Sequence, residues 1–337
     1  MQIENSKMIY RGSGELARVY RGQTIVWEPK KSFEGNYLTF EMISGGTIVY
    51  NNYKSDGILY YRKNGTEWTE FITENGSGTT TAYDGDIIEF KGQTNYRFGE
   101  LYSVNGRYNI YGNIMSLIYG DKFQGQKILT KDMMFHRTFS NEISESYPGA
   151  VNAENLILPA TTLTSGCYYG LFFKNRYLIT PPSLIDTALK SSCYHSMFAN
   201  CASLRSVPKM SIAPRYESCF RMFANCTSLT DASPIIIKSS IDSHACESMF
   251  IGCTALVNGP ILKAATLYYG SYRYMFSGCA SLQRVTCLAT NISEDKCLTN
   301  WMNGVPSGGV FTKNPNMTSW PTGVSGIPDG WTVVDNQ

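Results

Sequence analysis

The pattern of apolar and polar positions changes near residue 150 of the chain. Before that point, apolar residues alternate with polar ones in short runs, as in Leu38-Thr39-Phe40-Glu41-Met42. Such alternation is typical of β-strands that bury one face. After it, one apolar phrase returns every 25 to 27 residues, which is typical of a protein built from stacked repeats. We therefore predict a mainly β chain with short helices, ending in a solenoid.

Residues 1–34 carry a small tandem pattern. Ile-Tyr-Arg-Gly at residues 9–12 returns as Val-Tyr-Arg-Gly at residues 19–22, a spacing of 10 residues. Alternating residues around glycine turns favour β-hairpins. So short a segment cannot bury a core of its own. We predict that residues 1–34 are an attachment segment of β-hairpins followed by a linker.

Residues 35–129 read as a β-sandwich-like domain. Ile58–Lys63 is a strand-like run, and Asn64-Gly65 follows it. Asn-Gly readily adopts the positive φ angles of a type I′ hairpin turn. Short strand runs separated by such turn signals are typical of sandwiches of this size.

The repeats are aligned on a Phe that follows Met or Leu. The spacings between successive copies are 26, 25, 27 and 26 residues, and a Leu follows six residues after the later copies. One such unit cannot bury its apolar stripe alone, but stacked units share a continuous core. We predict a solenoid over residues 130–300 and a C-terminal cap over 301–337. Its predicted core residues are Phe172, Phe198, Phe223, Phe250, Phe276, Leu204, Leu229, Leu256, Leu282, Cys193, Cys201, Cys226, Cys253 and Cys279.

Within each unit we expect a short helical turn and a brief strand. The phrase Cys193-Tyr194-x-x-Met197-Phe198 supplies the predicted helical turn, and Asn200 is a residue that tolerates a left-handed cap. Apolar runs such as Ile235-Ile236-Ile237 then pair into a parallel ladder. The Met-Phe stripe is interpreted as core and not as a cofactor site.

The ten cysteines all lie between Cys167 and Cys297, at the repeat spacing. Zinc ligands usually come in pairs two to four residues apart, whereas here six or seven residues separate the two cysteines of a unit. We therefore predict a ladder of small buried thiols with no metal and no cofactor. Disulfides between stacked copies are a geometric alternative.

No set of residues predicts catalysis. His195 lies two residues after Cys193, but it occurs in one repeat only. The carboxylate pairs Asp84/Asp86 and Glu142/Glu145 are common surface types. We predict that the protein is not an enzyme and has no catalytic residues.

Tyrosine is frequent, with 23 copies, and several flank the Met-Phe pairs. Tyr offers a large contact surface at low entropic cost. These residues either form a ligand face or pack between adjacent repeats. The candidates for the ligand face are Tyr168, Tyr194, Tyr216, Tyr268 and Tyr272.

Charge and hydropathy exclude several partners. The formal net charge is +2, and no lysine- or arginine-rich run is present, so nucleic acid is not predicted as a partner. The chain contains no stretch of 18 apolar residues, so membrane insertion is not predicted. The start of the chain carries no apolar core of signal-peptide length, which we interpret as a mature form or as use without secretion.

The recurring phrase Cys-Tyr-x-x-Met-Phe-x-x-Cys-x-Ser-Leu resembles the BspA-like leucine-rich-repeat proteins of Bacteroidetes. The resemblance covers about residues 130–331. Proteins of this kind are similar to bacterial surface adhesins and to virion proteins of phages that infect Bacteroidales, including crAss-like phages. The N-terminal segment resembles the attachment segments of phage fibre and tail proteins.

This resemblance implies a virion structural protein, a head- or tail-associated fibre assembled in the host cytoplasm. It implies attachment to other virion proteins through Tyr10, Tyr20 and Trp27, and a repeat surface that binds a host-surface glycan or protein. By analogy with fibre proteins it implies a homo-oligomer, a trimer. The alternative is a BspA-like adhesin at a bacterial cell surface.

Overall fold

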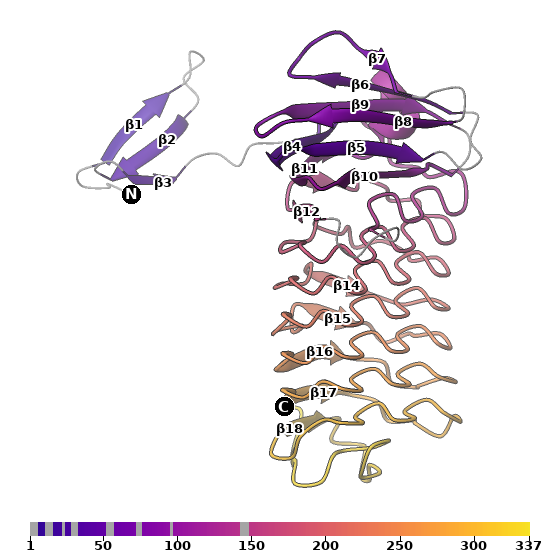
Figure 1. Ribbon diagram of the computed structural model, residues 1–337. Coiled ribbons are helices and arrows are strands. Elements are labelled where there is room, and N and C mark those ends of the chain that lie inside the picture. The colour runs from indigo at the N-terminus through magenta and orange to yellow at the C-terminus, as the bar shows by residue number, and fades with distance from the viewer. Residues whose placement is uncertain are drawn as a thin grey trace.

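The structure is a computed structural model that describes most of the chain. The described residues are 6–10, 16–21, 24–27, 33–51, 57–71, 76–94, 97–141 and 148–337, and for 6–27 only the backbone is described. The fold is mainly β with one short α-helix among these residues, and its C-terminal half is a β-solenoid of about 5 turns (Figure 1). The prediction of a mainly β chain ending in a solenoid is confirmed.

The N-terminal segment forms a small antiparallel sheet. Its strands are β1 (Ser6–Tyr10), β2 (Leu16–Arg21) and β3 (Thr24–Trp27), in the order β1-β2-β3. Tyr10, Tyr20 and Trp27 belong to these strands, but their side chains and the linker at 28–32 lie outside the described residues. Their role in attachment stays a prediction.

Two mainly antiparallel sheets follow. One has the order β10-β5-β8, and the other runs β12-β11-β4-β9-β6-β7. The strands are β4 (Leu38–Ser44), β5 (Gly46–Asn51), β6 (Ile58–Lys63), β7 (Thr69–Glu70), β8 (Ser77–Ala82), β9 (Ile87–Gln93), β10 (Glu100–Val104) and β11 (Arg107–Asn113). Asn64 and Gly65 have φ of 50° and 75° between the antiparallel β6 and β7, as their sequence predicts.

Strand β11 joins these sheets to the solenoid. It is antiparallel to β4 and parallel to β12 (Gly149–Asn152) and β13 (Leu156–Ile157). The helix α1 (Ser116–Tyr119) and a 3₁₀ turn, η1 (Gly120–Lys122), follow β11 and contact β9. Buried side chains form one cluster from Leu38 to Trp331. The two sheets and the solenoid therefore share a continuous core.

One side of the solenoid is a parallel sheet in chain order (Figure 1). Each repeat forms one turn of the solenoid, which we call a rung, and the later rungs contribute one strand each to this sheet. The strands are β14 (Met210–Ile212), β15 (Ile235–Ile237), β16 (Asn258–Leu262), β17 (Arg284–Cys287), β18 (Val310–Lys313) and β19 (Thr332–Asp335). The predicted strand at residues 235–237 is confirmed.

The opposite side of each rung is a chain of tight turns, and the predicted short helices are wrong there. His195 N–H donates to Ser192 O three residues back at 3.1 Å, whereas Tyr194 N–H donates to Ser218 O in the next rung at 2.9 Å. This alternation of local and inter-rung hydrogen bonds repeats along each rung, and we call it the turn ladder. A helix would direct every N–H to a carbonyl four residues back.

Left-handed residues at every fourth position enforce this arrangement. Ser192, Ser196 and Asn200 have φ of 55°, 53° and 63°, and the equivalent residues of neighbouring rungs also have positive φ. A positive φ breaks a right-handed helix at that residue. Asn200 thus has the left-handed conformation expected of it, but it closes a turn of the ladder and caps no helix.

Stacked Phe rings form the centre of the solenoid. The ring centroids of Phe172, Phe198, Phe223, Phe250 and Phe276 are separated by 5.8, 5.4, 5.4 and 5.9 Å in that order. The Phe, Leu and Cys residues predicted as repeat core all have 0% exposure. Trp301 packs on Phe276 at 6.0 Å and Trp320 stacks on Trp301 at 6.0 Å, so indole rings cover the C-terminal end of the column.

Candidate ligand-binding face

Four aromatic rings stack on the outer face of the turn ladder. His136, Tyr169, His195 and Phe220 each lie three residues before the core Phe of their rung. Their centroids are separated by 4.8, 4.2 and 4.7 Å, with interplanar angles of 20°, 9° and 19°. We call these four residues the aromatic column.

The rings of the aromatic column stack on one another, so neighbouring rings cover each other's faces. Tyr169, His195 and Phe220 are half-buried, and His136 is 9% exposed. A ligand that approaches from solvent therefore meets ring edges and not ring faces. The edge of an aromatic ring carries the positive part of its quadrupole, so this surface favours oxygen atoms and anions.

Two arginines flank the column. The Arg137 guanidinium lies 5.9 Å from the Tyr169 ring and 5.5 Å from the Phe173 ring, and the Arg221 guanidinium lies 5.4 Å from the Phe220 ring. Together with Tyr169, His195 and Phe220 of the column they line a groove of about 380 Å³, the turn-side groove. Asn200, Asn225 and Ile251 also line it, and its described lining includes no Asp or Glu.

The histidines of the column are neutral at pH 7. Burial lowers the pKa of His136 to about 3, assisted by the nearby charges of Arg97 and Arg137. Burial also lowers the pKa of His195 to about 4, assisted by Arg221. The positive charge of the turn-side groove therefore comes from its arginines.

In the two rungs after that of Phe220, the same repeat position holds Glu247 and Arg273, which form an ion pair. Glu247 accepts hydrogen bonds from Arg273 Nη2 at 2.6 Å and Nε at 3.0 Å, and it contacts His244 Nδ1 at 2.6 Å. The Glu247 carboxylate is buried and Arg273 largely neutralises it. The cationic part of the face therefore ends at the rung of Phe220.

Comparison with known proteins gives no relative. No family model, curated protein or solved structure matches the chain. The resemblance to BspA-like proteins stays a prediction from the repeat phrase.

The predicted place in the ligand face is wrong for three of the five tyrosines. Tyr168, Tyr194 and Tyr272 are 1%, 2% and 0% exposed, because they occupy the inward position four residues before the core Phe. Burial raises their pKa above the usual range. These three follow the alternative reading, in which tyrosines pack between repeats.

Tyr216 and Tyr268 are exposed, at 47% and 48%. They line a second groove of about 530 Å³ together with Asp242 and Ser243. They have the accessibility that a ligand face needs, and their predicted role in binding stays a prediction. This groove contains an acidic side chain and no basic one among its described lining residues, unlike the turn-side groove.

The aromatic column itself was missed from the sequence. The signal was present, because His136, Tyr169, His195 and Phe220 are separated by 33, 26 and 25 residues. Aromatic residues of different types share one repeat position there. The sequence interpretation weighed His195 as a base for Cys193 against a surface or groove histidine, and it did not align His195 with the aromatic residues of the other repeats.

The cysteines hold neighbouring rungs together. The thiols of Cys201, Cys226, Cys253 and Cys279 donate to the carbonyls of Phe172, Phe198, Phe223 and Phe250 in the preceding rung at 3.1, 3.2, 3.0 and 3.2 Å. All ten cysteines are free and buried, so the structure has the predicted thiol ladder and not the disulfide alternative. Over the described residues, no group of three or more His, Cys, Asp or Glu is placed to hold a metal ion.

The other cysteine column spans two positions of the repeat. Cys193 lies five residues before Phe198, whereas Cys219 lies four residues before Phe223. Both positions face inward, and both residues have 0% exposure. Cys219 therefore takes the place that Tyr194 has in the rung before it.

Of the candidate catalytic pairs, the described one, Asp84 and Asp86, makes hydrogen bonds within the fold. Burial pushes the Asp86 pKa upward, but hydrogen bonds from Tyr83 N and Asn64 Nδ2 and the charge of Lys63 outweigh it and hold the pKa below its usual value. Asp84 accepts a hydrogen bond from Gly45 N at 2.6 Å. Glu142 and Glu145 lie outside the described residues. Cys193 is buried, which raises the pKa of its thiol.

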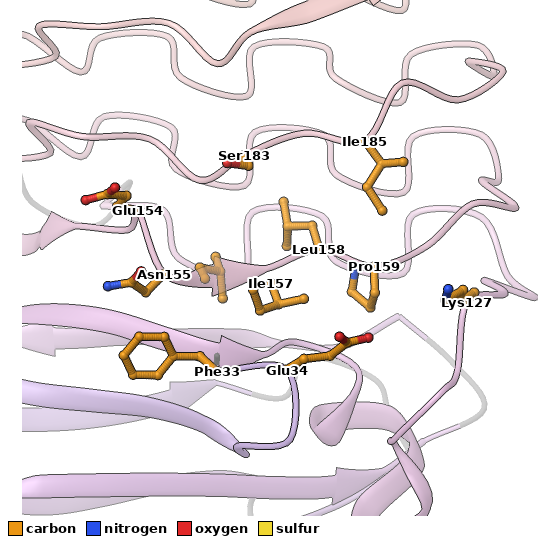
Figure 2. A pocket seen from close by; sticks show the side chains of 11 residues that line it. Phe33, Glu34, Lys127, Glu154, Asn155, Ile157, Leu158, Pro159, Ser183 and Ile185 are labelled. Carbon is orange, nitrogen blue, oxygen red and sulfur yellow. The ribbon is translucent and has the colours of Figure 1, made fainter. Parts of the chain in front are cut away.

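A further groove of about 480 Å³ lies where the two sheets meet the solenoid. Figure 2 shows Leu158 and Ile185 on its solenoid side and Phe33 on the opposite side. Glu34, Glu154 and Lys127 also line it, so its charged lining residues are two carboxylates and one ammonium group. Within the described part of the chain, no helix has the length and apolar character needed to cross a membrane.

Proposed function

We propose that this chain is a structural protein of a phage virion, a head- or tail-associated fibre that displays a leucine-rich-repeat surface for host attachment. The observation that carries the proposal is the turn-side groove. Its lining comes from five rungs, from Arg137 to Ile251. A surface of this kind suits an extended partner, because stacked repeats place equivalent side chains in a line.

The repeat chemistry supports a BspA-like solenoid. Most of the later rungs contribute one short parallel strand, and Leu204, Leu229, Leu256 and Leu282 pack at 0% exposure at the same repeat position. The phrase that carries the resemblance is thus the phrase that builds the core.

The N-terminal segment is proposed to attach the protein to other virion proteins through Tyr10, Tyr20 and Trp27. Its described backbone is a three-stranded antiparallel sheet. A sheet of this size gains stability by packing on another surface. The trimer is proposed by analogy with fibre proteins alone.

Mass spectrometry of purified particles tests the proposal. We expect the chain in the particles, and we expect deletion of residues 1–28 to remove it from them. Circular dichroism of the purified deletion protein should still show the β-rich fold. Absence of the chain from particles contradicts the proposal, and its recovery from a bacterial cell envelope would favour the adhesin alternative.

A further inference from the structure

We infer that the second groove of the solenoid, the one lined by Tyr216 and Tyr268, binds an uncharged polysaccharide. We call it the tyrosine groove. The inference rests on the proposed function, because it names a ligand class for the displayed repeat surface. It depends on the place of the groove in the solenoid, its exposed rings, its hydroxyl groups and its charge.

The tyrosine groove lies where three successive rungs pass from the parallel sheet to the turn ladder. Tyr216 follows β14, residues 239–243 follow β15, and Tyr268 follows β16. Counted from the core Phe of each rung, Ser243 holds the repeat position of Tyr216, and Asp242 holds that of Tyr268. The middle rung therefore has small side chains between two tyrosines, which leaves a groove of about 530 Å³.

The two tyrosine rings are accessible to a ligand, unlike the stacked rings of the aromatic column. Tyr216 and Tyr268 are 47% and 48% exposed. Among the described residues, Tyr216 contacts one ring, that of His244, at 5.9 Å and an angle of 77°, and Tyr268 contacts none. The face of an aromatic ring carries the negative part of its quadrupole, so it attracts the C–H groups of a pyranose.

Hydroxyl groups dominate the rest of the groove. Six of its nine lining residues carry one. No hydrogen bond to a described residue engages the side chains of Ser239, Ser240, Ser243 and Thr266. Each hydroxyl both donates and accepts a hydrogen bond. These side chains therefore match the hydroxyl groups of a sugar, which also do both.

The charge of the groove is balanced. Asp242 is the only carboxylate among its described lining residues, and Arg215 Nε lies 3.1 Å from Asp242 Oδ2. Arg215 itself does not line the groove. An acidic ligand would therefore meet a carboxylate and no cationic lining residue, whereas a neutral sugar meets no repulsion and can donate a hydroxyl to Asp242.

The spacing of the tyrosines favours a chain of linked sugars over a single sugar. Tyr216 and Tyr268 belong to rungs that are two apart, those of Phe223 and Phe276. Adjacent parallel strands are about 4.8 Å apart, which places the two tyrosines about 10 Å apart along the solenoid axis. One pyranose covers one ring, whereas linked sugars lying along the axis reach both.

Binding of the purified full chain to immobilised neutral polysaccharides, measured by biolayer interferometry, tests the inference. The probes are dextran, pullulan, laminarin, xyloglucan and galactomannan, which differ in their sugars and linkages. We expect at least one of them to bind. We expect this binding to persist as salt is added, because screening weakens only interactions between charges.

Removal of either ring should weaken that binding. Tyr216→Ala and Tyr268→Ala should each weaken it about five- to tenfold, because each variant loses one stacking contact. Tyr177→Ala is the matched control. Tyr177 is also an exposed tyrosine of the solenoid, at 43%, but it does not line the groove, so its replacement should leave binding unchanged. Circular dichroism should show the same β-rich fold in all three variants.

Three results would overturn the inference. They are no binding of any of the five polysaccharides, binding by the Tyr216→Ala and Tyr268→Ala proteins that equals that of the Tyr177→Ala protein, and binding that disappears as salt is added. The last result would indicate a charged partner, which the balanced groove does not suit.

Failure of this inference and failure of the proposed function are distinguishable. Presence in particles is read by mass spectrometry and does not depend on Tyr268. A chain that is found in particles but binds none of the polysaccharides retains the proposed virion role and loses the assigned ligand. A chain that binds one of them but is absent from particles retains the ligand and loses the virion role.

Discussion

At the scale of single residues, the thiols of the solenoid act as small donors between rungs. Cys226 has 0% exposure, and its thiol donates to Phe198 O at 3.2 Å. Burial raises the pKa of Cys253 to about 12, and it raises the pKa of Cys226 too. A thiol held protonated and away from solvent is a poor nucleophile.

Thiol titration checks this arrangement. The folded protein should react slowly with a water-soluble disulfide reagent, and unfolding in denaturant should release all ten thiols. Cys297, at 4% exposure, should be the first to react. Rapid reaction of several thiols in the folded protein, or fewer than ten after unfolding without reductant, would contradict the thiol ladder.

The histidines of the aromatic column make stability depend on pH. The pKa of His195 is about 4 when folded and about 6.5 when unfolded, so the unfolded chain binds more protons between these values. The contribution of the neutral imidazole is therefore complete above pH 6.5 and is lost as the pH falls towards 4. The free energy of unfolding should decrease by about 1–2 kcal/mol from pH 7 to pH 5 through this group.

His195→Phe isolates that contribution, because Phe220 shows that the position accepts a phenyl ring. Urea unfolding of both proteins at pH 7 and pH 5 is the measurement. The variant should lose less stability on acidification than the parent protein, and an equal loss would argue against a neutral His195 in the folded state.

At the scale of elements, the sequence predicted which residues of a rung form its core and its strand, but not the conformation of its turn side. Spacing alone located the core Phe and Leu residues and the strands, because an inward side chain must recur at the repeat length. The turn ladder was mistaken for a helix because Cys193-Tyr194 and Met197-Phe198 are four residues apart. Over so short a segment that period is close to the 3.6 residues of a helix.

Hydrogen bonds to the neighbouring rung determine whether this segment forms a helix or a turn ladder. Tyr194 N–H finds Ser218 O only after the next repeat has stacked on it. The same error misplaced the ligand face. In a helix, Tyr168 and Tyr169 would lie only about 100° apart around the axis, so both could reach solvent. The ladder instead buries Tyr168 and turns Tyr169 outward.

The left-handed column of the ladder gives a direct test. Gly278 has φ of 78°, and an added Cβ would meet no atom closer than Gly252 Cα at 3.5 Å. Gly278→Val should therefore destabilise through backbone strain, by about 1–2 kcal/mol. Gly278→Asn should cost clearly less, since Asn200 and Asn225 hold this position in earlier rungs. Equal losses in urea unfolding would contradict a left-handed residue 278.

At the scale of the whole molecule, β11 couples the two sheets to the solenoid. It pairs with β4 on one side and with β12 and β13 on the other. No repeat signal marks this junction, so the sequence analysis, which predicted a boundary at residue 130, did not predict a strand shared by the two parts. Solenoid stability is approximately a sum of rung and neighbour terms, and a fault at β11 should therefore weaken the first rungs most.

Gly112→Ala introduces such a fault. Gly112 has φ of 85°, and an added Cβ would lie 2.0 Å from Tyr37 O, so the backbone of β11 must shift. Gly85→Ala is the matched control, because Gly85 has φ of 81° and nothing within 4 Å of an added Cβ. The two variants share the strain of a positive φ and differ in the clash at the junction.

Hydrogen exchange measured by mass spectrometry separates local from propagated effects. In the Gly112→Ala protein, amides of β12 and β13 should exchange at least tenfold faster, which corresponds to about 1.4 kcal/mol. The effect should fall off through β14 and β15 and vanish by β17, because each rung contacts only its neighbours. An effect confined to the two sheets would mean that β11 does not couple the parts. A uniform effect as far as β18 would mean that the solenoid opens as one unit, which hydrogen bonds between adjacent rungs alone do not require.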